Sequence, residues 1–190
     1  MNKVTWKPGT MIYPLPAVMV SCGSNDSEYN IITISWTGTI CSDPPMCYIS
    51  VRPERHSYGI IRKAGGYVIN LTTSGLVRAT DWCGVRSGAR QNKFRETGLT
   101  PIPALTVAAP MIAESPVNIE CRVREIKELG SHHMFLSEVT AIHADERYIE
   151  GDTGAFRLDK AGLLCYSHGK YFSTGEFLGK FGFSVRKKRK

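Results

Sequence analysis

Short apolar runs alternate with clusters of turn-forming residues along the first half of the chain, a pattern typical of β-strands joined by tight turns. Runs rich in apolar and β-branched residues predict strands at 17–22, 30–36, 46–51 and 66–71. Two prolines in the segment 42–45 cannot continue a central strand, so a turn is expected there. This part of the chain is therefore expected to be mainly β.

Three short helices are predicted among these strands. A helix at 57–64 has Ser57 as its expected N-cap and two glycines after its last residue. Helical segments are also predicted at 75–85, with a stop near Gly84, and at 93–97. Helices of this length interrupt the strand pattern without replacing it.

The second half of the chain returns to strands. Apolar and polar residues alternate over 117–126, and a second long strand is predicted at 134–143, with 127–131 as a hairpin-like connector. Beyond Gly169 the sequence is rich in aromatic residues and glycine, and we expect arms or turns there. The pattern as a whole predicts one mainly β domain over 1–185, a β-barrel with short helices.

The formal net charge is +7, and the tail 186–190 supplies five of the positive charges. Such a tail is either a solvated terminus or a contact for an anionic partner such as nucleic acid. The remaining excess is small, although a site for an anionic cofactor would use part of it.

Composition and cysteine spacing favour a cytoplasmic protein without a membrane partner. The chain has no apolar run of 18 residues, and its first 16 residues lack the continuous apolar stretch of a signal peptide. Six cysteines are scattered without a C-x-x-C pair, which favours free buried thiols over disulfides. No Cys/His spacing predicts a metal site.

Two segments before and at the first predicted helix are candidates for contacting a ligand, and the second of them for binding a phosphate. Segment 35–40 places Gly38 among hydroxyl residues beside Trp36, which would let a ligand approach the backbone; alternatively Trp36 belongs to the core. Arg52 and Arg55 precede the helix, where free N–H groups and the helix dipole favour phosphate; alternatively they pair with an acid or with solvent.

A third candidate is the segment 84–94, which carries glycine, serine and three cations but no acid. It does not have the residue order of a P-loop, and it is either a second contact for the same anion or a plain cationic loop. No motif of a hydrolase, metalloprotease or carboxylate pair occurs. The residues therefore favour a bound anionic ligand over side-chain acid–base catalysis, and no catalytic residue is predicted.

Taken in order, these motifs resemble the flavin reductase-like, FMN-binding split-barrel family, in particular its flavoredoxin branch. The resemblance covers about residues 8–180. No single motif is specific, but the order and spacing are. The matching segments are 30–51, 52–58, 68–71, 83–88, 93–94, 98–99, 109–110, 115–121 and 130–132.

The resemblance implies a split β-barrel and a homodimer that holds FMN near the subunit interface. It places segment 30–39 along the isoalloxazine and ribityl chain, and Asn70 and His132 near the flavin. The implied phosphate contacts are Arg52, Arg55, Ser57 and Lys93, with Ser87 as a further one. The implied cofactor contacts are Asn30, Thr33, Ser35, Trp36, Thr37, Gly38, Thr39, Arg52, Arg55, Ser57, Asn70, Ser87, Lys93 and His132.

This chain departs from the family pattern at two places. Residues 89–92 read Ala-Arg-Gln-Asn where the family often has Arg-Asp and an acid before the lysine, which leaves the pairing of Lys93 open. His56 stands where another residue is common, and we assign it no role.

The leading functional hypothesis is an NAD(P)H:flavin oxidoreductase, in which NADH or NADPH passes hydride to flavin N5. Electrons would then go to a second flavin or to a protein partner. The alternative is a flavoredoxin-like electron carrier with tightly bound FMN, little NAD(P)H turnover and a redox protein as partner. A nucleic-acid-binding module is suggested only by the basic tail and lacks any reader motif, so nucleic acid is not an expected partner.

Overall fold

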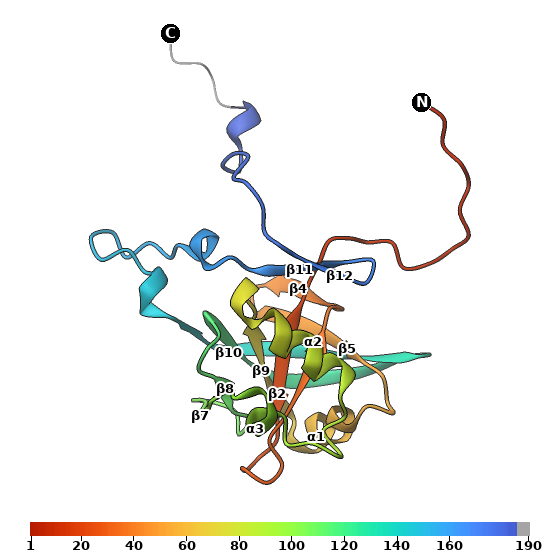
Figure 1. The fold of residues 1–190 in the computed structure, drawn as a ribbon, viewed down its shortest axis with the longest axis vertical. Coiled ribbons are helices and arrows are strands. Elements are labelled where there is room, and N and C mark those ends of the chain that lie inside the picture. The colour runs from red at the N-terminus through yellow and green to blue at the C-terminus, as the bar shows by residue number, and fades with distance from the viewer. Residues whose placement is uncertain (186–190) are drawn as a thin grey trace.

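The computed structural model describes residues 1–185, so the predicted basic tail at 186–190 lies outside the described residues. Figure 1 shows a β-barrel with short helices beside it and two terminal segments that extend away from the barrel. The predicted fold class, mainly β with short helices, is confirmed. No helix among residues 1–185 has the length and apolar character needed to cross a membrane.

The barrel is one seven-stranded sheet in which the paired strands are antiparallel, in the order β3-β2-β6-β9-β10-β5-β4. The outermost strands, β3 and β4, are consecutive and are joined only by Ser35 and Trp36, so the sheet closes on itself where the chain bends. The strand bounds are β2 Val18–Cys22, β3 Asn30–Ile34, β4 Thr37–Ser42, β5 Pro45–Val51, β6 Gly66–Leu71, β9 Val117–Leu129 and β10 His132–Ala144.

Alternation along the strands fills the barrel. On β5, Cys47, Ile49 and Val51 are buried while the residues between them are half-buried, as expected for a strand with one face inside. These side chains join one cluster with apolar residues of β2, β3, β6, β9 and β10, including the fully buried Phe135. Because all these strands contribute side chains to one core, the sheet curves around that core and forms a barrel.

Two helices cover the outer face of β2 and β3. They are α2 (Val77–Val85), preceded by a 3₁₀ turn at Ser74–Leu76, and α3 (Lys93–Thr97). Met19 and Ile31 point away from the barrel and form a second cluster with residues of these helices. Because β2 is buried on both faces, its residues are apolar except for Ser21, whose hydroxyl donates to the Pro110 carbonyl.

The remaining elements are short. A third helix, α1 (His56–Ala64), follows β5, and β7 pairs with β8. After the barrel, the hairpin β11–β12 pairs with β1 near the N-terminus. Their bounds are β1 Leu15–Pro16, β7 Pro101–Ile102, β8 Met111–Ile112, β11 Leu164–Ser167 and β12 Lys170–Ser173, with 3₁₀ turns at Glu146–Tyr148, Leu158–Ala161 and Phe183–Val185.

Three expectations for local structure were wrong. Residues 127–129 of the expected connector extend β9, and β10 begins at His132, which leaves Gly130 and Ser131 as a two-residue turn. Gly130 adopts the required left-handed conformation, with φ of 77°. A separate strand, β4, begins at Thr37, since Ser35 and Trp36 bend the chain. Pro45 begins β5, where a missing N–H is tolerated.

The N-terminus of α1 also differs from the prediction. Arg55, not Ser57, occupies the N-cap position, and its side chain does not cap the helix. Ser57 lies one residue inside the helix and is buried, where its hydroxyl accepts a hydrogen bond from Asn30. The helix ends as predicted, with Gly65 in the left-handed conformation.

Candidate functional site

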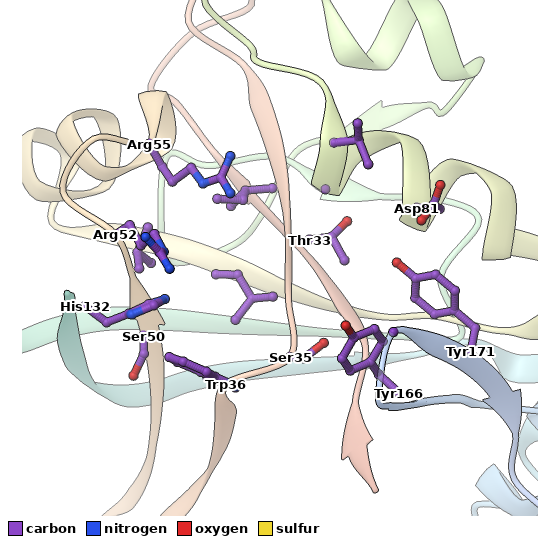
Figure 2. A pocket seen from close by; sticks show the side chains of 16 residues that line it. Thr33, Ser35, Trp36, Ser50, Arg52, Arg55, Asp81, His132, Tyr166 and Tyr171 are labelled. Carbon is purple, nitrogen blue, oxygen red and sulfur yellow. The ribbon is translucent and has the colours of Figure 1, made fainter. Parts of the chain in front are cut away.

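A cleft of about 400 Å³ lies where the bend between β3 and β4 meets β5, α2 and the β11–β12 hairpin (Figure 2). Its floor includes Thr33, Ser35 and Trp36. Figure 2 shows Arg52, Arg55 and His132 at one end and Asp81, Tyr166 and Tyr171 at the other. The labelled residues come from β3, the bend, β5, the segment between β5 and α1, α2, β10 and the C-terminal hairpin.

Trp36 forms part of the cleft wall. Its carbonyl accepts a hydrogen bond from the Ser50 amide at 2.9 Å, which ties the bend to β5. Its ring lies 4.2 Å from the His132 ring, centre to centre, with 47° between their planes. The side chain is half-buried, so the alternative in which Trp36 belongs to the barrel core does not hold.

The cationic end of the cleft has charges available for a ligand. Arg52 has an ion pair with Glu54 at 3.5 Å, and because both side chains are exposed this pair contributes little. Burial, together with the positive charges of Arg52 and Arg55, lowers the pKa of His132. His132 is therefore neutral near pH 7, and the arginines carry the charge at this end.

A second cavity, of about 120 Å³, adjoins this end of the cleft and is called here the side pocket. It shares Ile32 and Arg55 with the cleft. The volume corresponds to about four water molecules in the liquid, which is room for one compact polar group. The side pocket is lined by Ile32, Glu54, Arg55, His56, Ser57, Arg86, Ser87, Gly88 and Lys93.

Lys93 is the most unusual of these residues, because it is only 3% exposed. Its Nζ donates a hydrogen bond to the Cys83 carbonyl at 2.6 Å. Burial lowers the pKa of the ammonium group, and the ionisable neighbours that act on it are Cys83, Cys22 and Arg55. None of these neighbours is a carboxylate.

The two thiols do not compensate the charge of Lys93. Burial raises the pKa of Cys22 to about 12 and that of Cys83 to about 11, so both thiols are neutral near pH 7. A buried ammonium without a negative partner is costly, and an anion in the side pocket would supply the missing charge.

The N-terminus of α1 faces the same pocket with its own positive end. No side chain caps its first turn, which contains no acidic residue. The Tyr58 N–H donates to the Arg55 carbonyl at 2.9 Å, which leaves the N–H groups of His56 and Ser57 to bind an anion. The helix has nine residues, and Arg62 and Lys63 at its far end complement its dipole.

Asn30 organises the hydroxyl group beside this helix end. Its Nδ2 donates to the Ser57 Oγ at 2.8 Å, and the Ser57 hydroxyl also lies within hydrogen-bonding reach of the Cys22 thiol. The Asn30 Oδ1 atom is buried and has no hydrogen-bond partner within residues 1–185. An orphaned acceptor at this position fits a ligand that carries a hydroxyl group.

The structure brings most of the predicted site residues together. Thr33, Ser35, Trp36, Arg52, Arg55 and His132 line the cleft, and Ser57, Ser87 and Lys93 line the side pocket. Asn30 lies directly behind Ser57. The Thr33 hydroxyl also donates to the Thr80 carbonyl of α2, which sets the orientation of this side chain.

Four predicted residues are placed elsewhere. The Thr37 hydroxyl donates to the Tyr48 carbonyl at 2.6 Å, and Gly38 and Thr39 continue along β4 without lining the cleft. Asn70 is fully buried between Met19, Ser21, Ile112 and Asn118, and its side chain hydrogen-bonds to all four. Both the Nδ2 and the Oδ1 atoms of the Asn70 amide are therefore already hydrogen-bonded to other residues of the protein.

Several polar lining residues were not among the predicted cofactor contacts, in particular Ser50, Asp81, Arg86, Tyr166 and Tyr171. Arg86 lies in the segment 84–94, whose positive charge was recognised from the sequence, and that charge could have assigned Arg86 to the site. Tyr171 belongs to the predicted aromatic region beyond Gly169, whereas Tyr166 precedes it, and nothing local indicates that the hairpin reaches the cleft. Burial and the nearby Asp81 carboxylate raise the pKa of Tyr171 to about 12, so its phenol keeps its proton.

Residues 10–175 match the family model described as flavin reductase like domain. Flavoredoxin of Desulfovibrio vulgaris (Miyazaki F) is 30% identical and superimposes with a TM-score of 0.89 over 97% of this chain and 100% of that one. Flavoredoxin from Methanosarcina acetivorans is 26% identical, with a TM-score of 0.86 over 98% of this chain and 100% of that one.

A third relative is a reductase component. It belongs to the 4-nitrophenol 4-monooxygenase/4-nitrocatechol 2-monooxygenase of Rhodococcus opacus, and is 26% identical over 59% of this chain and 57% of its own length. The family match covers most of the chain, and its strands form the barrel that surrounds the cleft. The protein belongs to the flavin reductase-like family, as its motifs predicted.

Proposed function

We propose that the protein binds FMN non-covalently in the cleft and side pocket and acts as an NAD(P)H-dependent flavin reductase. The observation that carries this proposal is the buried Lys93, which has no carboxylate partner among residues 1–185, in a small pocket that shares two lining residues with a larger cleft. A ligand with one compact anionic group attached to a large ring system matches this pair of cavities, and FMN has that form.

The residues of the side pocket would hold the phosphate. Lys93, Arg55 and Arg86 supply positive charge from α3, the N-cap of α1 and the loop after α2. The Ser57 hydroxyl and the free N–H groups of α1 add hydrogen-bond donors. The orphaned Asn30 Oδ1 would accept a hydrogen bond from a ribityl hydroxyl.

The cleft would hold the ring. Trp36 and Ile32 offer apolar surface, and Ser35 and Thr33 lie along the same wall. At the far end, the protonated phenol of Tyr171 and the carboxylate of Asp81 can pair with the polar edge of a flavin. When bound, FMN supplies a ring that accepts hydride and passes its electrons on. The protein's role is to bind, orient and partly enclose that ring.

The experiment that tests this function is anaerobic titration of the FMN-loaded protein with NADH and then with NADPH, followed by absorbance. We expect one of the two nucleotides to bleach the flavin bands rapidly, and steady oxidation of that nucleotide when free flavin is supplied. Bleaching by dithionite alone would favour the electron carrier. A protein that retains and binds no FMN would contradict the proposal.

A glycine at the side pocket provides a test of the proposed phosphate contacts. A Cβ at Gly88 would lie 2.1 Å from Asn30 Oδ1, so Gly88→Ala should push Asn30 away from Ser57. We expect FMN affinity, measured by fluorescence titration, to fall by about tenfold. In Gly59→Ala, a control within α1, the added methyl group meets no atom within 4 Å. This change should leave affinity unchanged and stabilise the helix by about 0.5–1 kcal/mol.

We also propose a homodimer. The terminal segments carry exposed large apolar side chains, with Trp6 73%, Phe177 71% and Leu178 88% exposed, and these segments extend beyond the barrel (Figure 1). Apolar surface of this kind favours burial against a partner, and a second copy is the partner that the family resemblance implies. Light scattering of the full chain should give twice the mass of one chain; a monomer would contradict this proposal.

A further inference from the structure

A second cleft, of about 410 Å³, shares Trp36 of the bend with the first cleft. The second is called here the apolar cleft, and the first is called the flavin cleft because FMN is proposed to bind there. It is formed between the N-terminal segment before β1 and the neighbouring strands β5 and β10. Its wall includes three aromatic rings, from Tyr13, Trp36 and Tyr48, and the methionines Met11 and Met134.

The chemistry of this cleft selects against charged ligands. None of its ten lining residues carries an ionised side chain at neutral pH. A charged molecule would lose hydration there without gaining a partner, whereas a flat aromatic molecule would pack against rings and sulfur atoms. The polar groups available are mainly hydroxyls, such as those of Thr10 and Ser50, which can donate hydrogen bonds to carbonyl oxygens.

The position of the apolar cleft connects it to the flavin cleft. Trp36 and Ser50 line both cavities, and the Ser50 amide holds the Trp36 carbonyl at 2.9 Å. Molecules in the two clefts would therefore be separated by this shared wall. A ligand in the apolar cleft is placed to exchange electrons with a ring in the other.

From these observations we infer that the apolar cleft binds a neutral, flat quinone that serves as an electron acceptor. A quinone has two carbonyl oxygens for the hydroxyl donors, carries no charge and is flat. Two electrons and two protons pass from reduced FMN to the quinone, which gives oxidised FMN and the hydroquinone. This redox step rests on the proposed function, whereas the binding of a quinone does not.

The test is equilibrium dialysis of 2,3-dimethyl-1,4-naphthoquinone against the full chain, with and without FMN. Both ring positions of this probe are blocked, so it does not add to cysteine thiols. We expect one quinone to bind per chain in both forms. Met11→Glu and Ile12→Glu place a charge in the cleft at residues that are 58% and 86% exposed, so folding is not threatened. Each should raise the quinone Kd by about tenfold and leave the FMN Kd unchanged.

Val4→Glu is the matched control, because Val4 is 82% exposed on the same segment and does not line the cleft. It should change neither affinity. The inference is overturned if the wild-type chain binds no quinone, if both cleft variants bind it normally, or if FMN displaces it, since displacement would place the quinone in the flavin cleft. Loss of FMN binding with quinone binding intact would instead contradict the proposed function alone.

Discussion

Lys93→Met is expected to weaken FMN binding by about 10- to 100-fold and to leave the flavin-free protein equally stable or more stable. The ammonium group supplies a charge-assisted hydrogen bond to the phosphate, which accounts for the loss of affinity. Without ligand, the same ammonium group is a buried cation that donates a hydrogen bond to the Cys83 carbonyl. Methionine removes the free-energy cost of burying this charge. Fluorescence titration with FMN and thermal unfolding of the flavin-free protein measure the two effects.

Lys63→Met is the control for the change in net charge. Lys63 is exposed on α1 and pairs with Glu28 at 2.9 Å, outside the side pocket. Its substitution should change FMN affinity by less than about twofold, since exposed ion pairs contribute little. Equal effects of the two substitutions, or an unchanged affinity in Lys93→Met, would contradict the assignment of the side pocket to phosphate. A large loss of stability in Lys93→Met would instead assign Lys93 a structural role.

Glu120→Ala is expected to lower the free energy of unfolding by about 2–4 kcal/mol. Glu120 lies on β9 with no exposed surface, and its carboxylate accepts hydrogen bonds from the Leu105 and Thr106 amides at 2.7 and 2.5 Å. The Thr106 hydroxyl and His143 Nε2 also bond to it, each at 2.6 Å. Alanine would leave these donors, most of them only half-buried, without their shared acceptor, and would leave a cavity at a fully buried position.

Thermal unfolding measures this loss, which for a chain of this size corresponds to a decrease in Tm of about 5–15 °C. Glu125→Ala on the same strand is the matched control. Glu125 is exposed, and its charged partner Lys127 lies 3.9 Å away, so we expect a change below about 0.5 kcal/mol. A similar small change in both variants would show that the loop around Thr106 does not depend on Glu120.

The contribution of Glu120 should depend on pH in a defined direction. Burial disfavours the carboxylate, but hydrogen bonds from Thr106, Leu105 and His143 outweigh it and lower the pKa of Glu120 to about 2. An unfolded glutamate protonates near pH 4.3, so between these values the unfolded chain binds more protons. The stabilisation is complete above about pH 4.3 and is lost as the pH falls toward about 2. The stability difference between wild type and Glu120→Ala should shrink over that window.

Local patterns in the sequence predicted much of the fold. The alternation on 46–51 and 117–126 corresponds to β5 and to most of β9, and the glycines after residue 64 end α1. These features depend on neighbours in the chain, because side chains alternate along a strand and because Gly65 adopts a left-handed conformation. The strand lengths were less predictable. Leu129 pairs with His132 and Glu128 pairs with His133, so β9 and β10 continue as far as the turn at Gly130.

The candidate site was predictable where its charged and hydroxyl residues lie close together in the sequence. Arg52, Arg55 and Ser57 are close together before and within one helix, and Lys93 ends a cationic segment. The hydrogen bond between Asn30 and Ser57 joins residues 27 positions apart, and no local pattern indicates such a pairing. Asn70 is the opposite case. A polar residue in a strand can bind a ligand or hydrogen-bond to neighbouring strands, and the Asn70 side chain hydrogen-bonds to Met19 and Ile112 of the protein itself.

The family, the β-rich character of the chain and the cationic residues of the site were predictable from the amino-acid order, because order, spacing and charge are properties of the chain. Three features required the folded structure: no carboxylate within residues 1–185 pairs with the buried Lys93, Tyr166 and Tyr171 reach the cleft, and Trp36 lines two cavities. These features arise where the barrel closes and the C-terminal hairpin folds back, and they depend on contacts between residues far apart in the chain.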